Sequence, residues 1–397
     1  MRLSERVNAI QPSPTMALNA RAGQMQAQGI DVVNLTVGQP DFPTPKHVCE
    51  AAIKAIEEGF TRYTPAAGIP ELKQAIVEKF ARQGLEYTTE QVMVNVGGKH
   101  SGYLVMQALV DPGDEVIVPA PYWVSYPPMV ILAGGKPVIL PTSQDNGFKL
   151  TPQQLEEAIT PRTKAVIINS PSNPTGAVYS PEELKPLVEI CINRGVVIVS
   201  DEIYETIVFD GLEFTPTPAL AQEVYDSTVV LNGVSKAYAM TGWRIGYMAG
   251  PAELVAACAK IQSQSTSNPT SIAQKAAVAA LTGPQDEVER MRASFEARRE
   301  VVMELLGQIP DVTCFRPQGA FYAFPDVSAY FGRKSPEGKE ITGSTALAEY
   351  LLDNAHVAVV PGAAFGEDRC IRLSFATSEA QIREGLKRIA GALGQLK

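Results

Sequence analysis

The chain has 397 residues, 45% of them hydrophobic and 19% charged, which is enough for a sizeable core and for more than one domain. The formal net charge of -9 and the lack of a Lys/Arg-rich run argue against a nucleic-acid-binding protein. The apolar runs are far shorter than the roughly 20 residues of a membrane-spanning helix, and residues 1–10 lack the apolar stretch of a signal peptide. We therefore expect a cytoplasmic protein without a membrane anchor.

The cysteines and histidines are few and widely spaced. Five cysteines form no C-x-x-C pair, and the three histidines stand at positions 47, 100 and 356. This spacing predicts neither a disulfide framework nor a metal site.

The predicted elements begin with residues 11–45, which are rich in Pro and Gly and are expected to form an arm with loops. From about residue 91, short runs rich in Val, Ile and Leu alternate with stretches of helical period, which predicts a parallel sheet buried on both faces in an α/β domain. Helices are expected at 99–110, 152–159 and 181–194, and the last two open with Thr-Pro and Ser-Pro, favourable N-cap and first-turn pairs. The expected strands are 92–96, 115–119, 136–140, 165–169, 196–200, 229–233 and 244–249.

The carboxyl-terminal part is expected to be distinct and smaller. A long amphipathic stretch at 285–306 predicts a helix that links it to the α/β domain. Apolar runs at 320–324, 357–360 and 370–375 then suit a small α+β arrangement.

The densest functional signal is the segment Gly233-Val-Ser-Lys236-Ala-Tyr-Ala-Met-Thr-Gly-Trp-Arg244-Ile-Gly246. It resembles the lysine segment of class I aminotransferases, in which small residues flank the lysine and an arginine follows eight positions later. A lysine between two strands is usually only solvated, but the small residues and the arginine favour the family's role. The resemblance implies that Lys236 holds pyridoxal phosphate (PLP) as a Schiff base and acts as the base on the substrate, two roles that a primary amine can fill.

Two further segments resemble the cofactor site of that family. Ser200-Asp201-Glu202-Ile203-Tyr204 follows a predicted strand, and ligands of open α/β sheets bind at such strand ends. The likeness implies that Asp201 pairs with the pyridine nitrogen and Tyr204 with the 3′ oxygen, although an Asp at a strand end is more often a helix cap. In Asn169-Ser-Pro-Ser-Asn173-Pro-Thr-Gly176 the prolines and glycine signal only a turn, but Asn173 matches a second ligand of that oxygen.

A glycine pair marks the expected phosphate site. Val96-Gly97-Gly98-Lys99 begins a predicted helix, where free N–H groups favour a phosphate, although it is neither a P-loop nor a dinucleotide fingerprint. The resemblance implies that the phosphate is held by Gly97, Gly98, Ser235 and Arg244. Pro121-Tyr-Trp123 resembles the segment whose aromatic ring stacks on the pyridine, and core packing is the alternative role for Trp123.

Three segments imply substrate and subunit contacts. Ile371-Arg372-Leu-Ser-Phe-Ala resembles the segment whose arginine pairs bidentately with the substrate α-carboxylate, and a surface arginine at a strand edge is the alternative. Gly38 in Val37-Gly38-Gln-Pro-Asp-Phe resembles the arm glycine whose backbone closes over the same carboxylate. The pattern from Tyr63 to Leu72 resembles the segment whose tyrosine reaches the phosphate of the neighbouring subunit, which implies a homodimer.

These segments occur in family order from about residue 36 to 376. The resemblance implies fold-type I: a large α/β domain with a mostly parallel seven-stranded sheet, one strand of it antiparallel, and a small α+β domain made from both chain ends. The expected division is 1–45 for the arm and part of the small domain, 46–296 for the large PLP-binding domain and 297–397 for the small C-terminal domain.

The likeness is strongest to the bacterial Iβ branch of aspartate aminotransferases, which implies transamination between aspartate and 2-oxoglutarate, giving oxaloacetate and glutamate. In that branch the lysine after Gly-Gly helps bind the acidic side chain, and Lys99 stands there; a solvated lysine at a helix start is the alternative. Some members use this lysine and arm residues, here including Thr15, to transaminate prephenate to arogenate. Gln11 stands where several of these dual-function members carry a basic residue.

Three other functions compete with this interpretation. A non-transaminating PLP lyase or synthase would share Lys236, Asp201 and Arg372. The sensing module of certain transcription regulators has the same fold but carries an extra DNA-binding domain, for which we expect no room before residue 11. A nicotinamide oxidoreductase would fit the sheet, but the sequence lacks its glycine fingerprint.

Overall fold

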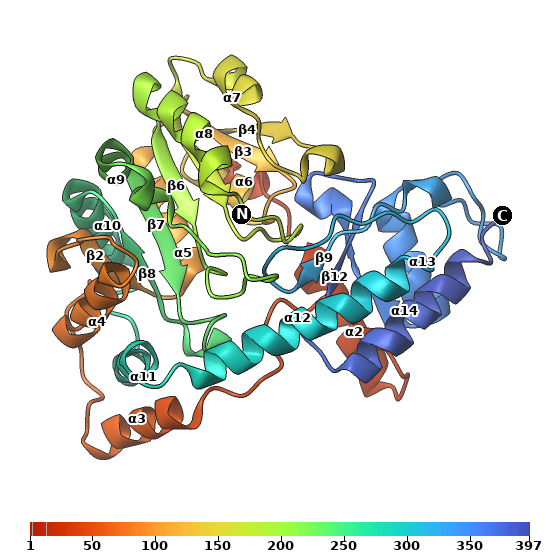
Figure 1. Cartoon of the computed structure of the whole chain (residues 1–397), viewed down its shortest axis with the longest axis horizontal. Coiled ribbons are helices and arrows are strands. Elements are labelled where there is room, and N and C mark those ends of the chain that lie inside the picture. Colours follow the sequence, from red (N-terminus) through yellow and green to blue (C-terminus); the bar gives the residue numbers. More distant parts are fainter. Residues whose placement is uncertain (2, 13) are drawn as a thin grey trace.

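A seven-stranded sheet with the order β2-β8-β7-β6-β5-β3-β4 forms the centre of the larger part of the molecule (Figure 1). This computed structural model describes residues 1–397 except residues 2 and 13, and it describes residues 14–17 by their main chain alone. The strands of the sheet are β2 (Val92–Asn95), β3 (Glu115–Ala120), β4 (Lys136–Pro141), β5 (Thr163–Asn169), β6 (Val197–Asp201), β7 (Thr228–Gly233) and β8 (Gly246–Ala249). Strand β8 is antiparallel to both its neighbours, and the remaining pairs are parallel. The expected α/β fold with a mostly parallel seven-stranded sheet is confirmed.

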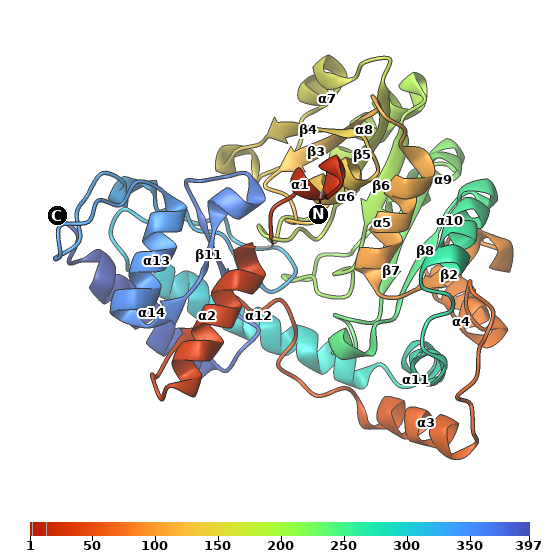
Figure 2. The same ribbon diagram turned by 180° about the vertical axis from the view of Figure 1, so that it is seen from behind.

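Side chains along the central strands alternate between two apolar layers. In β3, Val116 and Val118 pack with α5 (Gly98–Leu109), α6 (Tyr126–Leu132) and α10 (Ala252–Ser265), whereas Ile117 packs on the opposite face. Helices α7 (Pro152–Ala158), α8 (Pro181–Arg194) and α9 (Gln222–Ser227) cover that opposite face, and Figure 2 shows α5, α6 and α10 from behind. A parallel sheet needs a layer of helices on each face because its strands have apolar side chains on both faces. Edge strand β4 departs from the expectation, since it is only partly buried.

Local sequence explains where these helices begin and end. The Ser180 side chain accepts a hydrogen bond from the Glu183 N–H at the start of α8, and Pro181 occupies the first turn. Gly195 ends the same helix in a left-handed conformation with φ of +65°. Thr151 caps α7 in the same way as Ser180 caps α8, so both expected N-caps are confirmed.

Three helices pack together near the β2 end of the sheet. They are α3 (Lys46–Glu57), α4 (Pro70–Ala81) and α11 (Ser271–Thr282), and α11 contacts both of the others. Their apolar residues join the strand residues of β2, β7 and β8 in one cluster.

The smaller part combines both ends of the chain. Its three-stranded sheet has the order β11 (Val360–Pro361), β12 (Ile371–Ser374) and β9 (Tyr322–Ala323), and β1 (Val33–Asn34) pairs in parallel with β10 (Val357–Ala358). Helix α12 (Asp286–Leu306) runs from the larger part into this one, where α13 (Ser344–Ala355) and α14 (Glu379–Leu393) also pack (Figure 1). The buried residues of α12 recur every three or four positions, which gives it one buried face, apolar except for Arg299: Met291, Phe295, Arg299, Val302 and Leu306. The domain limits near residues 45 and 296 stay predictions.

Two sequence expectations need correction. Residues 11–45 do not form only an arm with loops, because Pro14–Ala27 is helix α2, which packs on the small part through Ala22. The strand expected at 244–249 begins at Gly246, since Arg244 has a left-handed backbone (φ +56°) that cannot continue a strand.

A short helix α1 (Glu5–Asn8) precedes α2. None of the described helices has the length and hydropathy needed to cross a bilayer.

Candidate active site

The predicted motifs meet at the carboxyl edge of the central sheet. Strands β5 and β6 place Asn169 opposite Asp201, and β6 and β7 place Asp201 opposite Leu231. The lysine segment follows β7 directly, so Lys236 reaches the same edge. Ligands of open α/β sheets bind at this edge because the loops there converge.

A cavity of about 610 Å³ lies at this edge. The predicted residues that line it are Gly38, Gly98, Lys99, Trp123, Asn173, Asp201, Tyr204, Ser235, Lys236, Arg244 and Arg372. Gly97 is adjacent, since a Cβ there would lie 2.4 Å from Arg244 Nη2. Tyr63 is not brought to the cavity, since it is 91% exposed on the surface of this chain. The predicted Thr15 side chain lies outside the described residues.

Lys236 is the amine of the cavity. Its Nζ donates a hydrogen bond to the Gly38 carbonyl at 2.6 Å. Burial, followed by the positive charges of Arg372 and Arg244, lowers the pKa of Lys236 to about 8. A substantial fraction of this amine is therefore neutral, and so nucleophilic, near physiological pH.

Asp201 is a buried carboxylate on the floor of the cavity, 8% exposed. The Tyr126 hydroxyl donates to Asp201 Oδ2 at 2.7 Å, and the Ile203 N–H donates to Oδ1 at 3.2 Å. Burial raises the pKa of Asp201, and the bond from Tyr126 opposes this rise. A cation placed against this carboxylate would relieve the desolvation, which suits a protonated ring nitrogen.

Arg372 presents a buried cationic fork. Its Nη1 donates to Asn173 Oδ1 at 2.9 Å and its Nη2 to the Thr36 carbonyl at 2.7 Å. Its Nε is buried and has no hydrogen-bond partner among the described residues. The guanidinium stacks on the Tyr322 ring at 4.4 Å, which fixes its plane. Burial lowers the pKa of Arg372, so an anionic partner would compensate for the lost solvation.

The glycines of the motif allow two backbones to approach closely. Gly97 is the N-cap of α5 with φ of +86°, a conformation that favours glycine. A Cβ on Gly246 would lie 2.2 Å from the Gly98 nitrogen, so β8 could not pack against this turn with any larger residue. The helix start and the Arg244 guanidinium together form a positive site that suits a phosphate.

Lys99 and Trp123 form another wall of the cavity. The Lys99 ammonium lies over the indole ring at 5.0 Å from its centroid. Desolvation and the nearby Arg244 charge lower the pKa of Lys99. No carboxylate among the described residues pairs with the Lys99 amine, so this amine can bind an anionic ligand.

Among the lining residues that were not predicted as site residues are Asn19, Tyr126 and Tyr322. Tyr322 shares a 2.9 Å hydrogen bond with the Tyr204 hydroxyl. Burial raises the pKa of Tyr204 well above its usual value, so this hydroxyl stays protonated and can donate to a ligand oxygen. No local sequence signal indicated the position of Tyr126, because its partner Asp201 is 75 residues away.

The residues present suit PLP in charge and in type. An amine faces the space for an aldehyde, a carboxylate suits a ring nitrogen, and a helix start with an arginine suits a phosphate. No histidine or cysteine lines the cavity in the described part of the chain.

Comparisons with known proteins agree with this geometry. The model of the family described as "Aminotransferase class I and II" matches residues 30–389. The chain is 51% identical to an aspartate aminotransferase of Geobacillus stearothermophilus, with 98% of each chain covered. It is 52% identical to an aspartate/prephenate aminotransferase of Cereibacter sphaeroides, over 98% of this chain and 97% of that one.

Solved structures give the same result. An aspartate aminotransferase from Rhizobium meliloti superposes with a TM-score of 0.96 at 47% identity, and both chains are covered completely. An aspartate aminotransferase from Thermus thermophilus with maleate superposes with a TM-score of 0.92 at 46% identity, over 99% of this chain and 100% of that one. The chain is thus an enzyme that belongs to the class I and II aminotransferase family.

Proposed function

We propose that this aminotransferase binds PLP and transfers the amino group of aspartate to 2-oxoglutarate, giving oxaloacetate and glutamate. The observation that carries the proposal is the pair of cations, Arg372 and Lys99, that line the cavity containing Lys236. Aspartate, glutamate and their 2-oxo acids are all dicarboxylates, so each needs two cationic contacts. The Thermus relative with maleate, also a dicarboxylate, supports this substrate class.

Each residue has a separate task in this proposal. PLP, when bound, supplies an electron sink for the substrate Cα–H bond. Arg372 binds the α-carboxylate and orients that bond, Lys236 accepts the Cα proton at Nζ, and Asp201 keeps the ring nitrogen protonated. The Gly97–Gly98 turn, Ser235 and Arg244 hold the phosphate, while Asn173 and Tyr204 contact the 3′ oxygen and Trp123 covers the ring face. A cytoplasmic location remains a prediction.

The experiment that tests the substrate uses the PLP-loaded protein mixed singly with aspartate, glutamate, arogenate, alanine and phenylalanine. Loss of the absorbance of lysine-bound PLP and gain of pyridoxamine phosphate report conversion. We expect rapid conversion with aspartate and glutamate, and slow conversion with alanine. A bound cofactor with no conversion by any amino acid would instead support a non-transaminating lyase.

Lys99→Met tests the second cation. We expect the KM for aspartate to rise by about 10- to 150-fold and the KM for alanine to stay within twofold. Only aspartate has a distal carboxylate, and the loss of its charged contact costs about 1.5–3 kcal/mol. Steady-state kinetics on both amino acids measure the difference. An equal change for both would mean that Lys99 is only a solvated residue at the start of α5.

Prephenate is the second candidate substrate. Relatives named aspartate/prephenate aminotransferase include the Cereibacter protein at 52% identity and one of Nitrosomonas europaea at 48%. Prephenate also carries two carboxylates, so it would use the same two cations. Equal rates with arogenate and aspartate in the panel would make the enzyme dual.

The pH dependence of cofactor uptake tests the environment of Lys236. Only the neutral amine attacks an aldehyde, and the pKa of Lys236 is lowered to about 8. Uptake of PLP by the cofactor-free protein should therefore speed up by about tenfold per pH unit below pH 8 and level off above it. A rate that continues to rise to about pH 10 would show an ordinary solvated lysine.

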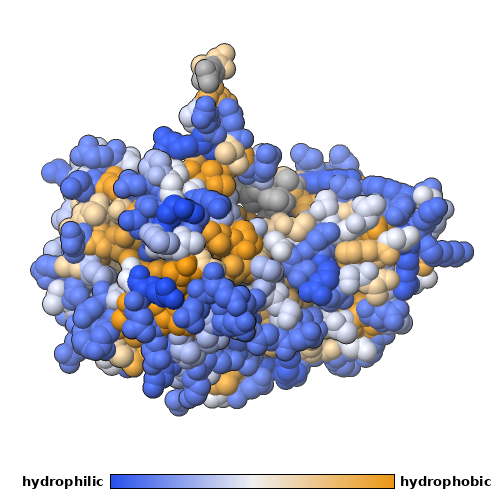
Figure 3. Space-filling model, turned by 90° about the horizontal axis from the view of Figure 1, so that it is seen from above, coloured by the Kyte–Doolittle hydropathy of each residue, from blue (hydrophilic) through white to orange (hydrophobic). Residues whose placement is uncertain are grey.

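We also propose a homodimer. Tyr63 is 91% exposed in the single chain, although the family pattern places this residue at a phosphate. The amino-terminal end projects from the body (Figure 3), and the apolar residues Met1, Leu3 and Val7 are exposed there. Such surfaces favour burial against a second copy. Sedimentation of the purified chain as a monomer would contradict the proposal.

A further inference from the structure

Residues 36–44, here called the strap, connect the two parts of the molecule across the cavity. The Thr36 carbonyl accepts a hydrogen bond from Arg372 at 2.7 Å, and the Gly38 carbonyl accepts one from Lys236 at 2.6 Å. At the far end, the Thr44 hydroxyl donates to the Ala239 carbonyl at 2.9 Å. The strap therefore touches both residues to which the proposed function assigns the chemistry.

The strap has little main-chain support of its own. Residues 37–43 form no backbone–backbone hydrogen bond with any residue that the structure describes. Prolines occupy two of these positions, 40 and 43, and lack an N–H to donate. The position of the strap must therefore depend on hydrogen bonds and contacts that involve side chains.

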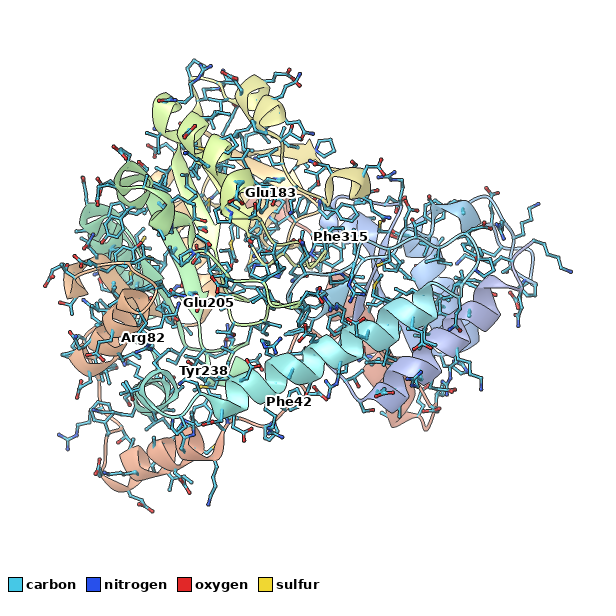
Figure 4. The ribbon with its side chains drawn as sticks, viewed as in Figure 1. Phe42, Arg82, Glu183, Glu205, Tyr238 and Phe315 are labelled. Carbon is cyan, nitrogen blue, oxygen red and sulfur yellow. The ribbon has the colours of Figure 1, made fainter. Side chains whose placement is uncertain are left out.

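Two neighbouring side chains of the strap attach it to α12. The Asp41 carboxylate accepts from both Nη atoms of Arg298, at 2.7 and 3.0 Å, a bidentate pair. The Phe42 ring meets Phe295 edge-to-face at 5.5 Å, and the Arg298 guanidinium lies 5.0 Å from the Phe42 centroid. Figure 4 shows Phe42 beside α12. Arg298 is 16% exposed and Asp41 30% exposed, so the pair is more shielded than an ordinary surface pair.

We propose that Asp41, Phe42 and Arg298, together called the clasp, are positioning residues that hold the strap in its binding-competent place before substrate arrives. The proposal rests on the proposed function, because Lys236 and Arg372 are the groups that the strap positions. Without the clasp, the strap would populate other conformations, and only a fraction of molecules would be ready to bind. Apparent affinity falls by that fraction, so KM rises while kcat changes little.

The test compares Asp41→Ala, Arg298→Ala and the double variant with the wild-type holoenzyme. Thermolysin cleavage within residues 36–44, measured without substrate, should become about tenfold faster in each variant, because a protease needs a segment that has left its place. The KM for aspartate should rise by about fivefold with kcat within twofold, and the double variant should equal Arg298→Ala because Asp41 has no partner once Arg298 is removed. Asp41→Asn, which keeps the shape, serves if an alanine variant does not fold.

Arg292→Ala is the matched control, because Arg292 lies on the same helix and pairs with Glu289 and Glu296 instead of the strap. Its cleavage rate and KM should match the wild type. Unchanged cleavage in both clasp variants would overturn the proposal, as would a fall in kcat at constant KM. If the wild-type protein does not transaminate aspartate, the proposed function fails, and the cleavage measurement alone still decides the clasp.

Discussion

Lys236→Ala is expected to lower the rate of aspartate transamination by at least about 10⁴-fold. Proton transfer by a positioned base alone contributes roughly 10²–10⁴-fold, and the variant also loses the amine that reacts with the cofactor. The measurement is the half-reaction with aspartate in PLP-reconstituted protein. Thermal unfolding should change little, because the Nζ of Lys236 makes one hydrogen bond, to the Gly38 carbonyl.

Lys260→Ala is the control for this variant, since Lys260 is exposed on α10, away from the cavity. It should retain full activity. Turnover by Lys236→Ala within tenfold of the wild type would remove Lys236 from the chemistry and with it the proposed mechanism.

Arg372→Ala is expected to lower kcat/KM for aspartate by about 10³-fold. The variant loses two charge-assisted hydrogen bonds to the α-carboxylate, each worth about 1.5–3 kcal/mol, and 4.1 kcal/mol corresponds to 10³. Arg372→Lys should recover only part of this loss, because an ammonium keeps the charge and lacks the planar fork. Steady-state kinetics of the wild type and the two variants measure kcat/KM for aspartate, which should fall in the order wild type, Arg372→Lys, Arg372→Ala.

A substrate without an α-carboxylate separates binding from folding. An amine that retains the distal carboxylate should react slowly and equally with the wild type and with Arg372→Ala. If the variant loses activity on this amine as well, the loss comes from a damaged site and the carboxylate role is wrong. Thermal unfolding is informative here because Arg372 is 3% exposed and its removal leaves a buried space.

Much of the fold was predictable because each central strand is a short apolar run with its own turn signals. Strand β7 begins at Thr228 and ends at Gly233, within one residue of the expected range. The helix starts at Ser180 and Thr151 were predictable for the same reason, because a cap is formed by four consecutive residues and needs no distant contact. Helix α2 was missed because its apolar residues form no clear stripe and Gly23 interrupts the pattern.

The site was predictable only where a motif carried it. Lys236, Asp201 and Arg372 stand in recognisable segments, and the structure brings all three to one cavity. Tyr126 belongs to a stretch of apolar and aromatic residues that reads as core, and its partner Asp201 is 75 residues away. Contacts of this kind, like those of the strap with α12, depend on three-dimensional proximity that no local pattern encodes.

The antiparallel strand β8 has a consequence for how the chain folds. Strand β2 pairs only with β8 within the described sheet, through contacts such as Val92 with Ala249. During synthesis from the amino terminus, β2 and the Gly97–Gly98 turn behind it therefore emerge long before the strand that seats them. Such non-local pairing is slow and leaves an unpaired edge exposed in the nascent chain. The phosphate end of the site is thus encoded early but assembled only after residue 249 has left the ribosome.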